Sequence, residues 1–165
     1  MQAKPVISNN TPLAALWSIG QVSLLRALYG EILIPQAVYY EFLAVEQPKR
    51  QELLLSSPWI IPVALEHPRR ALAFNGLDAG EAEVLALAEE LDARLLIVDE
   101  RKARQYAKRL GMPFTGTLGV LLAAKTGGHI TAIFPYVHAL LRNGLYLAPE
   151  IIIKALELAG ESKGA

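Results

Sequence analysis

One segment of the chain shows its secondary structure more clearly than the rest: DAGEAEVLALAEELDARLLIVD, which runs from Asp78 to Asp99. Its first part, Asp78–Leu91, is rich in Ala, Glu and Leu with acids near the start. This favours a helix, because acidic residues stabilise a helix N-terminus. Its second part, Leu95–Val98, is a bare apolar run of strand length. A helix that leads into a buried strand is typical of a parallel sheet.

The same alternation continues in both directions. Further strands are expected at Val6–Ser8, Glu31–Ile34, Trp59–Val63 and around Phe114. Further helices are expected from Pro12 (with Thr11 as N-cap) to a stop at Gly20, and at Val22–Leu28, Gln36–Leu43, Lys49–Leu55, Arg101–Leu110, Leu118–Thr126, Ile133–Arg142 and Pro149–Leu158. Residues 66–76 are expected to form a loop. The pattern predicts one domain over residues 1–165, an α/β fold built as a three-layer α/β/α sandwich with a parallel sheet of four or five strands. The last residues, Gly160–Ala165, are expected to fray.

The composition argues against several classes of protein. Hydrophobic residues make up 53% of the 165 residues, but no apolar stretch reaches the roughly 18 residues of a membrane span. A core segment or an oligomer interface explains this excess better. The absence of cysteine excludes disulfides and thiolate zinc sites, and no secretion signal is visible, so we expect a cytoplasmic protein. Because 16 basic residues balance 16 acidic ones, contact with nucleic acid requires a local patch.

Four polar residues lie in positions that suggest a common site: Asn9, Glu41, Glu81 and Asp99. Asn9 and Asp99 each follow an expected strand, so both would lie at the carboxyl edge of a parallel sheet, where open α/β sheets place their sites. Glu41 and Glu81 lie in expected helices. Three carboxylates and one carboxamide are suitable ligands for a hard divalent cation, and such a site indicates phosphodiester hydrolysis.

Each acid also has a simpler interpretation when it is taken alone. Glu81 heads an apolar helical stripe, but it also fits a first-turn acid that favours the helix dipole. Glu41 is near the wrong end of its helix for the dipole, and a salt bridge is its alternative. Asp99 fits the N-cap of the helix that follows it. Glu83 and Glu90 share another helix face and have the pattern of solvated charges.

A basic group lies on the expected helix after Asp99. Its members share or flank one face, with Arg101, Arg104 and Lys108 at i, i+3 and i+7 and Lys102 and Arg109 beside them. Such a face next to an acidic cleft could hold the phosphates of a single strand, although an ordinary solvated face explains it equally well. Thr115 and Thr117 could add hydroxyls to the site, and Thr117 fits equally well as a helix N-cap.

Several motifs occur in an order that is similar to a known family. They are Ser8-Asn9-Asn10-Thr11-Pro12-Leu13, Ile34-Pro35-x-x-Val38-x-x-Glu41, Asp78-x-Gly80-Glu81-Ala82-Glu83, Val98-Asp99-Glu100-Arg101-Lys102-x-Arg104, Gly116-Thr117-Leu118-Gly119, Ala124-Lys125 and Arg142-Asn143-Gly144. In these motifs the chain resembles a PIN-like family of prokaryotic proteins. The resemblance covers Val6 to about Leu158, and it depends on the order and spacing of the motifs together.

The resemblance implies an α/β/α fold and a Mg²⁺- or Mn²⁺-dependent ribonuclease, related to the VapC-type toxins that pair with antitoxins. It places four acidic positions on Asn9, Glu41, Glu81 and Asp99. In such a site Asp99 would hold the cation beside Asn9, while Glu41 and Glu81 would orient it or its bound water. The expected catalytic residues are Glu41, Glu81 and Asp99, the expected metal ligands are these three and Asn9, and the expected substrate-binding residues are Arg101, Lys102, Arg104 and Thr115.

The chain departs from the family pattern at Asn9, where PIN nucleases usually carry Asp. An amide oxygen can bind a hard cation, but it brings no charge. The four residues therefore carry a formal charge of −3 instead of −4, and metal binding should weaken.

Three functional hypotheses follow. The first is a divalent-metal-dependent endoribonuclease that cuts single-stranded RNA, attenuated by Asn9 and acting as the toxin of a toxin–antitoxin pair. The second is a catalytically degenerate PIN-like module that binds RNA or a protein partner. The third is an assembly role through the C-terminal helices. The high apolar content favours a homodimer or higher oligomer.

Overall fold

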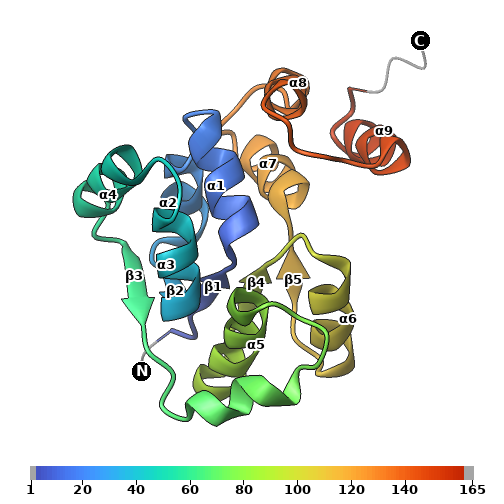
Figure 1. Ribbon diagram of the computed structural model, residues 1–165. Helices are drawn as coiled ribbons and strands as arrows, with labels where there is room; N and C mark the ends of the chain where they lie inside the picture. The colour runs from blue at the N-terminus through green and yellow to red at the C-terminus, as the bar shows by residue number, and fades with distance from the viewer. Residues whose placement is uncertain (1–2, 162–165) are drawn as a thin grey trace.

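The computed structural model of the protein describes residues 3–161 (Figure 1). Its centre is a sheet of five parallel strands in the order β3-β2-β1-β4-β5. The strands are β1 (Val6–Ser8), β2 (Ile32–Pro35), β3 (Ile60–Val63), β4 (Leu95–Ile97) and β5 (Phe114–Thr115). The parallel sheet confirms the predicted fold class. Residues 162–165, which belong to the tail expected to fray, lie outside the described residues.

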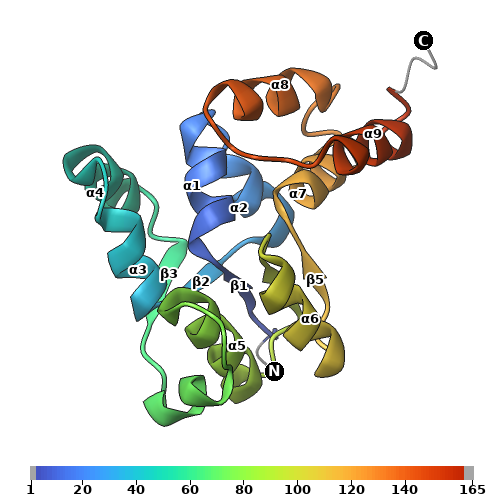
Figure 2. The ribbon, with the colours of Figure 1, turned by 45° about the vertical axis from the view of Figure 1, so that its right-hand side comes forward.

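Helices flank the sheet. They are α1 (Asn10–Ser18), α2 (Ser23–Tyr29), α3 (Gln36–Leu43), α4 (Gln47–Ser56), the 3₁₀ helix η1 (Pro68–Ala73), α5 (Ala79–Leu91), α6 (Arg101–Arg109), α7 (Thr117–Thr126), α8 (Phe134–Arg142) and α9 (Pro149–Leu158). Helix α5 packs against β1 and β2 and also against α3, α6 and η1. In both views α8 and α9 lie together, at the end of the molecule away from α5 and η1 (Figures 1 and 2). Within residues 3–161 no helix combines the length and the apolar character needed to span a bilayer.

Strand β1 occupies the middle of the sheet and places the residues that follow it. All three of its residues are completely buried, and it pairs in parallel with β2 on one side and β4 on the other. Ile7 is in register with Leu33 of β2 and Leu96 of β4. At the end of β1 the N–H of Asn9 donates to the carbonyl oxygen of Ile97 at 3.0 Å. The carboxyl ends of β1 and β4 therefore meet at one edge of the sheet, as predicted.

The predicted start of the first helix is wrong. Helix α1 begins at Asn10, and the N-cap position belongs to Asn9, not to Thr11. Asn9 has an extended backbone, with φ −81° and ψ 172°, and its side chain makes no capping hydrogen bond. The reason is that β1 passes directly into the helix, so the chain has no separate turn in which Thr11 could act as a cap.

The segment 66–76, expected to be a loop, contains the 3₁₀ helix η1. The carboxylate of Glu90 on α5 holds this segment by accepting hydrogen bonds from the N–H groups of Glu66 at 2.7 Å and His67 at 3.0 Å. The prediction of Glu90 as a solvated charge missed these two hydrogen bonds, which lie at the exposed surface. Its helical position suggests solvent exposure, but the segment before η1 lies across α5 and brings two N–H donors to it.

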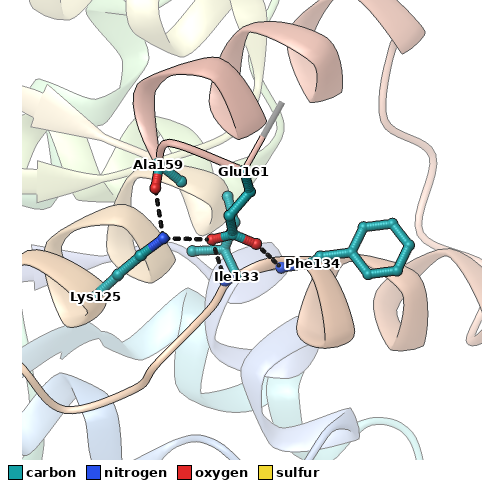
Figure 3. A network of polar contacts seen from close by, with 5 residues as sticks. All are labelled: Lys125, Ile133, Phe134, Ala159 and Glu161. Carbon is teal, nitrogen blue, oxygen red and sulfur yellow. Dashed lines mark hydrogen bonds and ion pairs between the residues drawn. The ribbon is translucent and has the colours of Figure 1, made fainter. Parts of the chain in front are cut away.

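The chain beyond α9 is tied to α7 and α8 through the carboxylate of Glu161 (Figure 3). This group accepts hydrogen bonds from the N–H of Ile133 at 2.7 Å, the N–H of Phe134 at 2.9 Å and Nζ of Lys125 at 3.0 Å. Lys125 also donates to the carbonyl oxygen of Ala159. Burial works against ionisation of Glu161, but these hydrogen bonds and the charge of Lys125 outweigh it and lower the pKa of Glu161. One carboxylate thus joins three helices.

Candidate active site

Asn9, the first residue after β1, turns its side chain into the protein interior. The residue is only 4% exposed. Among the described residues, its Oδ1 has no hydrogen-bond partner, and the same is true of Oδ1 of Asn10. A buried amide oxygen without a partner costs about 1–3 kcal/mol. A cation or a proton donor beside it would remove that cost, so Oδ1 of Asn9 is a candidate ligand.

Glu41 meets Asn9 at the first turn of α5. A Cβ atom at Gly80 would lie 2.8 Å from Oε1 of Glu41 and 3.4 Å from Oδ1 of Asn9, so both oxygens face the same backbone position. Glycine inside a helix costs about 1 kcal/mol relative to alanine, and here it allows the close approach. Gly80 was not predicted to be part of the site, although a glycine in the first turn of a strong helix was a usable signal. Glu41 is exposed, so solvent reaches this position.

Glu81 lies in the first turn of α5, where it forms a capping box with Asp78. Its Oε2 accepts a hydrogen bond from the N–H of Asp78 at 3.3 Å, and Oδ1 of Asp78 accepts one from the N–H of Glu81 at 2.8 Å. The interpretation of Glu81 as a first-turn acid is therefore correct. It is compatible with a role in the site, because Glu81 also feels the charge of Glu41.

Negative charge accumulates around Glu41 and Glu81. Partial burial of the Glu41 carboxyl raises its pKa above the ordinary value of 4.5, and the charge of Asp78 raises it further. Burial also raises the pKa of Glu81, and repulsion from Asp78, Glu100 and Glu41 outweighs the hydrogen bond that opposes the shift. Within residues 3–161 neither glutamate forms an ion pair, so the salt bridge considered for Glu41 is wrong. Such uncompensated carboxylates are favourable places for a cation.

Asp99 follows β4, but its side chain is held by α7. Its Oδ1 accepts the N–H of Thr117 at 2.8 Å, and its Oδ2 accepts the hydroxyl of Thr117 at 2.6 Å. Nη2 of Arg104 lies 3.9 Å from Oδ1. The alternative of Asp99 as a cap of α6 is wrong because Glu100 takes that position, and Thr117 is the first residue of α7, with Gly116 as its N-cap. A side chain at Gly116 would collide with both Asp99 and Arg104.

The four predicted residues thus fall into two parts. Asn9 and Glu41 share one contact with α5, and Glu81 is near enough to repel Glu41. Asp99 is engaged by α7, and in the described residues no hydrogen bond or ion pair joins it to the other three. No group of three or more His, Cys, Asp and Glu side chains within residues 3–161 is arranged to hold a metal. The unpartnered amide oxygen of Asn9 beside a carboxylate nevertheless fits a hard cation, which takes both kinds of oxygen as ligands.

The basic side chains predicted to share one face of α6 do not all point to solvent. Arg101 and Lys102 are exposed, and Lys102 lies beside the loop that leads into α5. Arg104 turns toward the sheet, where its Nε donates to the carbonyl oxygen of Val98 at 2.8 Å. Thr115 is half-buried and faces the first turn of α7, where a side chain at Gly119 would collide with its hydroxyl. Of the predicted substrate-binding residues, Arg101 and Lys102 therefore have side chains open to solvent.

A polar contact between α5 and α3 was also not predicted from the sequence. Oε1 of Glu83 accepts a hydrogen bond from the N–H of Ala37, in the first turn of α3, at 3.0 Å. The prediction that Glu83 is a solvated charge is therefore wrong. The periodicity of a helix shows which residues share a face, but it does not show which neighbouring helix brings a donor to that face.

A family model described as PIN domain matches residues 5–161 of the chain. The chain belongs to the PIN domain family. A comparison with curated proteins gave no match. The predicted family resemblance is confirmed, and PIN domains are typically nucleases and typically depend on a metal.

Partial burial of the Glu41 carboxyl, together with repulsion from Asp78, leads to a stability prediction for this PIN domain. Replacing Glu41 by Gln removes a charge that the folded state disfavours, so Glu41→Gln should raise the thermal midpoint of the metal-free protein slightly at pH 7. The pKa of Glu41 is raised on folding, so the penalty exists above that pKa. The gain should shrink as the pH falls through the folded-state pKa and vanish below the unfolded-state value, near 4.5.

Differential scanning calorimetry between pH 4 and pH 8 measures this effect. The matched control is Glu52→Gln, at an exposed position of α4, which should leave the midpoint unchanged over the same range. A midpoint for Glu41→Gln that is lower than that of the parent protein at pH 7 would contradict the assigned cost of the ionised Glu41 carboxylate.

Proposed function

We propose that this PIN domain is a divalent-metal-dependent endoribonuclease that hydrolyses phosphodiester bonds of single-stranded RNA. The observation that carries the proposal is the buried, unpartnered Oδ1 of Asn9 beside Oε1 of Glu41. Both atoms are oxygens of the kind that Mg²⁺ and Mn²⁺ bind. The nuclease activity that is typical of PIN domains supports the same function.

Each residue of the site has a definite task in this proposal. Asn9 and Glu41 would hold the cation, and Glu81 and Asp99 would add negative charge around it. When bound, the cation lowers the pKa of water and offsets negative charge on the phosphodiester. Its charge would offset the repulsion between Glu41 and Glu81 and keep both ionised, because a nearby positive charge favours the carboxylate form. Thr117 keeps Asp99 in one orientation through two hydrogen bonds.

The substrate would approach along the start of α6. Arg101 and Lys102 are exposed there, two and three residues after Asp99, and their charges suit the phosphates on either side of the cleaved bond. A substrate-binding role for Arg104 and Thr115 stays a prediction from the sequence. In the structure Arg104 is turned toward the sheet and Thr115 toward α7.

A second candidate function is a PIN-like module that binds RNA or a protein without cleaving it. Asn9 favours this alternative, because it removes one negative charge from the site. The hydrogen bonds that already engage Glu81 and Asp99 favour it as well. The two functions differ in one property, which is whether the site binds a divalent cation tightly enough for turnover.

Exposed apolar side chains on and before α9 support an association of the protein. Tyr146 and Leu158 are 82% and 68% exposed, and Ile153 on α9 is exposed as well. A partner that covers large exposed apolar side chains removes their surface from water, which favours association. We propose that a second copy of the chain covers them in a homodimer or higher oligomer, and that the enzyme acts as a toxin whose antitoxin is a further protein partner.

The nuclease proposal predicts metal-dependent cleavage. Purified protein with Mn²⁺ should cut a single-stranded RNA internally, and EDTA should stop the reaction. Because loss of cation stabilisation is worth several kcal/mol, Glu41→Ala and Asp99→Ala should each lower the rate by about a hundredfold or more. Gel analysis of a labelled RNA measures this, with Glu52→Ala as the control that keeps full activity. Cleavage that survives the double variant Glu41→Ala/Glu81→Ala would refute the proposal.

The two candidate functions predict different results for Asn9→Asp. In an attenuated nuclease the added charge should strengthen Mn²⁺ binding on the order of tenfold, since ligand charge tunes such affinities, and cleavage should rise with it. The metal-free variant should be less stable, because it adds a buried charge near Glu41. Isothermal titration calorimetry and the RNA assay test these expectations. A folded variant without a gain in affinity or cleavage would favour the binding module.

A further inference from the structure

We propose that Glu83 is a positioning residue of this site: by accepting the N–H of Ala37, it holds helix α3, and with it Glu41, at a fixed place against α5. The inference rests on the proposed function insofar as Glu41 is taken to be a metal ligand. Three observations support it: the hydrogen bond itself, the way the two ends of α3 are held, and the short distances at Gly80.

The hydrogen bond joins the two helices that supply the glutamates of the site. Glu83 follows Glu81 by two residues on α5, and Ala37 precedes Glu41 by four residues on α3. Residues four apart lie on the same face of a helix, one turn from each other. The N–H that Glu83 accepts at 3.0 Å and the carboxylate that meets Gly80 are therefore one turn apart on α3.

Helix α3 has no N-terminal cap from its own sequence. Its N-cap position is Pro35, no local side chain caps it, and its first turn contains no acidic residue. The first N–H groups of a helix have no partner within the helix and carry partial positive charge, so they attract a carboxylate. Glu83 supplies that carboxylate from the neighbouring helix.

The opposite end of α3 is held by Arg50 of α4. Its Nη1 donates to the carbonyl oxygen of Phe42 at 2.9 Å, and its guanidinium lies over the rings of Phe42 and Trp17, at 4.7 Å and 4.9 Å. Arg50 is only 8% exposed. These two polar attachments lie at opposite ends of α3 and add to the apolar packing of its buried residues Val38 and Phe42. Without Glu83, the N-terminal end of α3 would keep its packing but lose its hydrogen bond to α5, so small shifts of that end would cost less.

The tolerance for such shifts is small. Oε1 of Glu41 is only 2.8 Å from the place of a Cβ atom at Gly80. Metal–ligand distances are satisfied only within a few tenths of an ångström. Outer groups that orient metal ligands are worth roughly tenfold to a hundredfold in metal affinity in other proteins. Replacement of Glu83 should therefore lower the metal affinity of the site, even though Glu83 is not itself a proposed ligand.

The chain offers a matched control for this test. Glu90 lies on the same helix and also accepts backbone N–H groups, those of Glu66 and His67, but it holds the segment before η1 and not α3. Removal of either carboxylate loses hydrogen bonds of the same kind. Only Glu83 is connected to the helix that carries Glu41.

The first measurement is the Mn²⁺ affinity of the full-length protein by isothermal titration calorimetry. Glu83→Ala should weaken binding about tenfold, and Glu83→Gln should recover most of it because its side-chain oxygen still accepts a hydrogen bond. Glu90→Ala should lower the thermal midpoint but leave the affinity within about twofold. Equal affinities for Glu83→Ala and the parent protein would overturn the proposal.

The second measurement needs no metal. The side-chain amide signals of Asn9 in an NMR spectrum of the metal-free protein report on the groups beside it, so they should shift in Glu83→Ala and stay in place in Glu90→Ala. Unmoved signals in Glu83→Ala would overturn the proposal. If Glu83→Ala fails to fold, Glu83→Asp, which is one methylene too short to reach Ala37, is judged by the same signals. A parent protein that binds no Mn²⁺ would refute the proposed function, while the Asn9 signals would still decide the role of Glu83.

Discussion

The close approach of α5 to α3 at Gly80 is the constraint on which the site depends. It brings an uncharged buried oxygen from the end of β1 and a carboxylate from α3 to the same place. Neither group is favourable there by itself, because Oδ1 of Asn9 lacks a partner among the described residues and partial burial raises the pKa of Glu41. The fully buried strand β1, paired on both sides, supports this arrangement. A cation would relieve both costs.

Local signals predicted the elements and the edge of the sheet that carries the site. Helix α3 occupies the expected residues 36–43, and Asp78 caps α5 at the start of the expected helix. The alternation of strands and helices predicted parallel pairing, which places Asn9 and Asp99 at the same edge of the sheet. Helix propensity, capping and the alternation of strands with helices are set by residues close together in the chain, so a single sequence records them directly.

Contacts between distant elements could not be predicted in this way. Glu83 and Glu90 have the helical positions of solvated charges, but α3 and the segment before η1 bring N–H groups to them. Thr117 meets Asp99 because β5 lies beside β4 and leads into α7. Each contact depends on which element packs opposite, and periodicity contains no record of that choice. The contacts that hold the candidate ligands were therefore harder to predict than the positions of Asn9 and Asp99 at the edge of the sheet.

The most direct test of the account is the position of Mn²⁺ in crystals of the protein, located by anomalous X-ray scattering. The account predicts one strong peak within bonding distance of both Oδ1 of Asn9 and the carboxylate of Glu41, on the side of α5 where Gly80 lies. Crystals grown at saturating Mn²⁺ with no peak at that place, or with the ion bound only elsewhere, would contradict it.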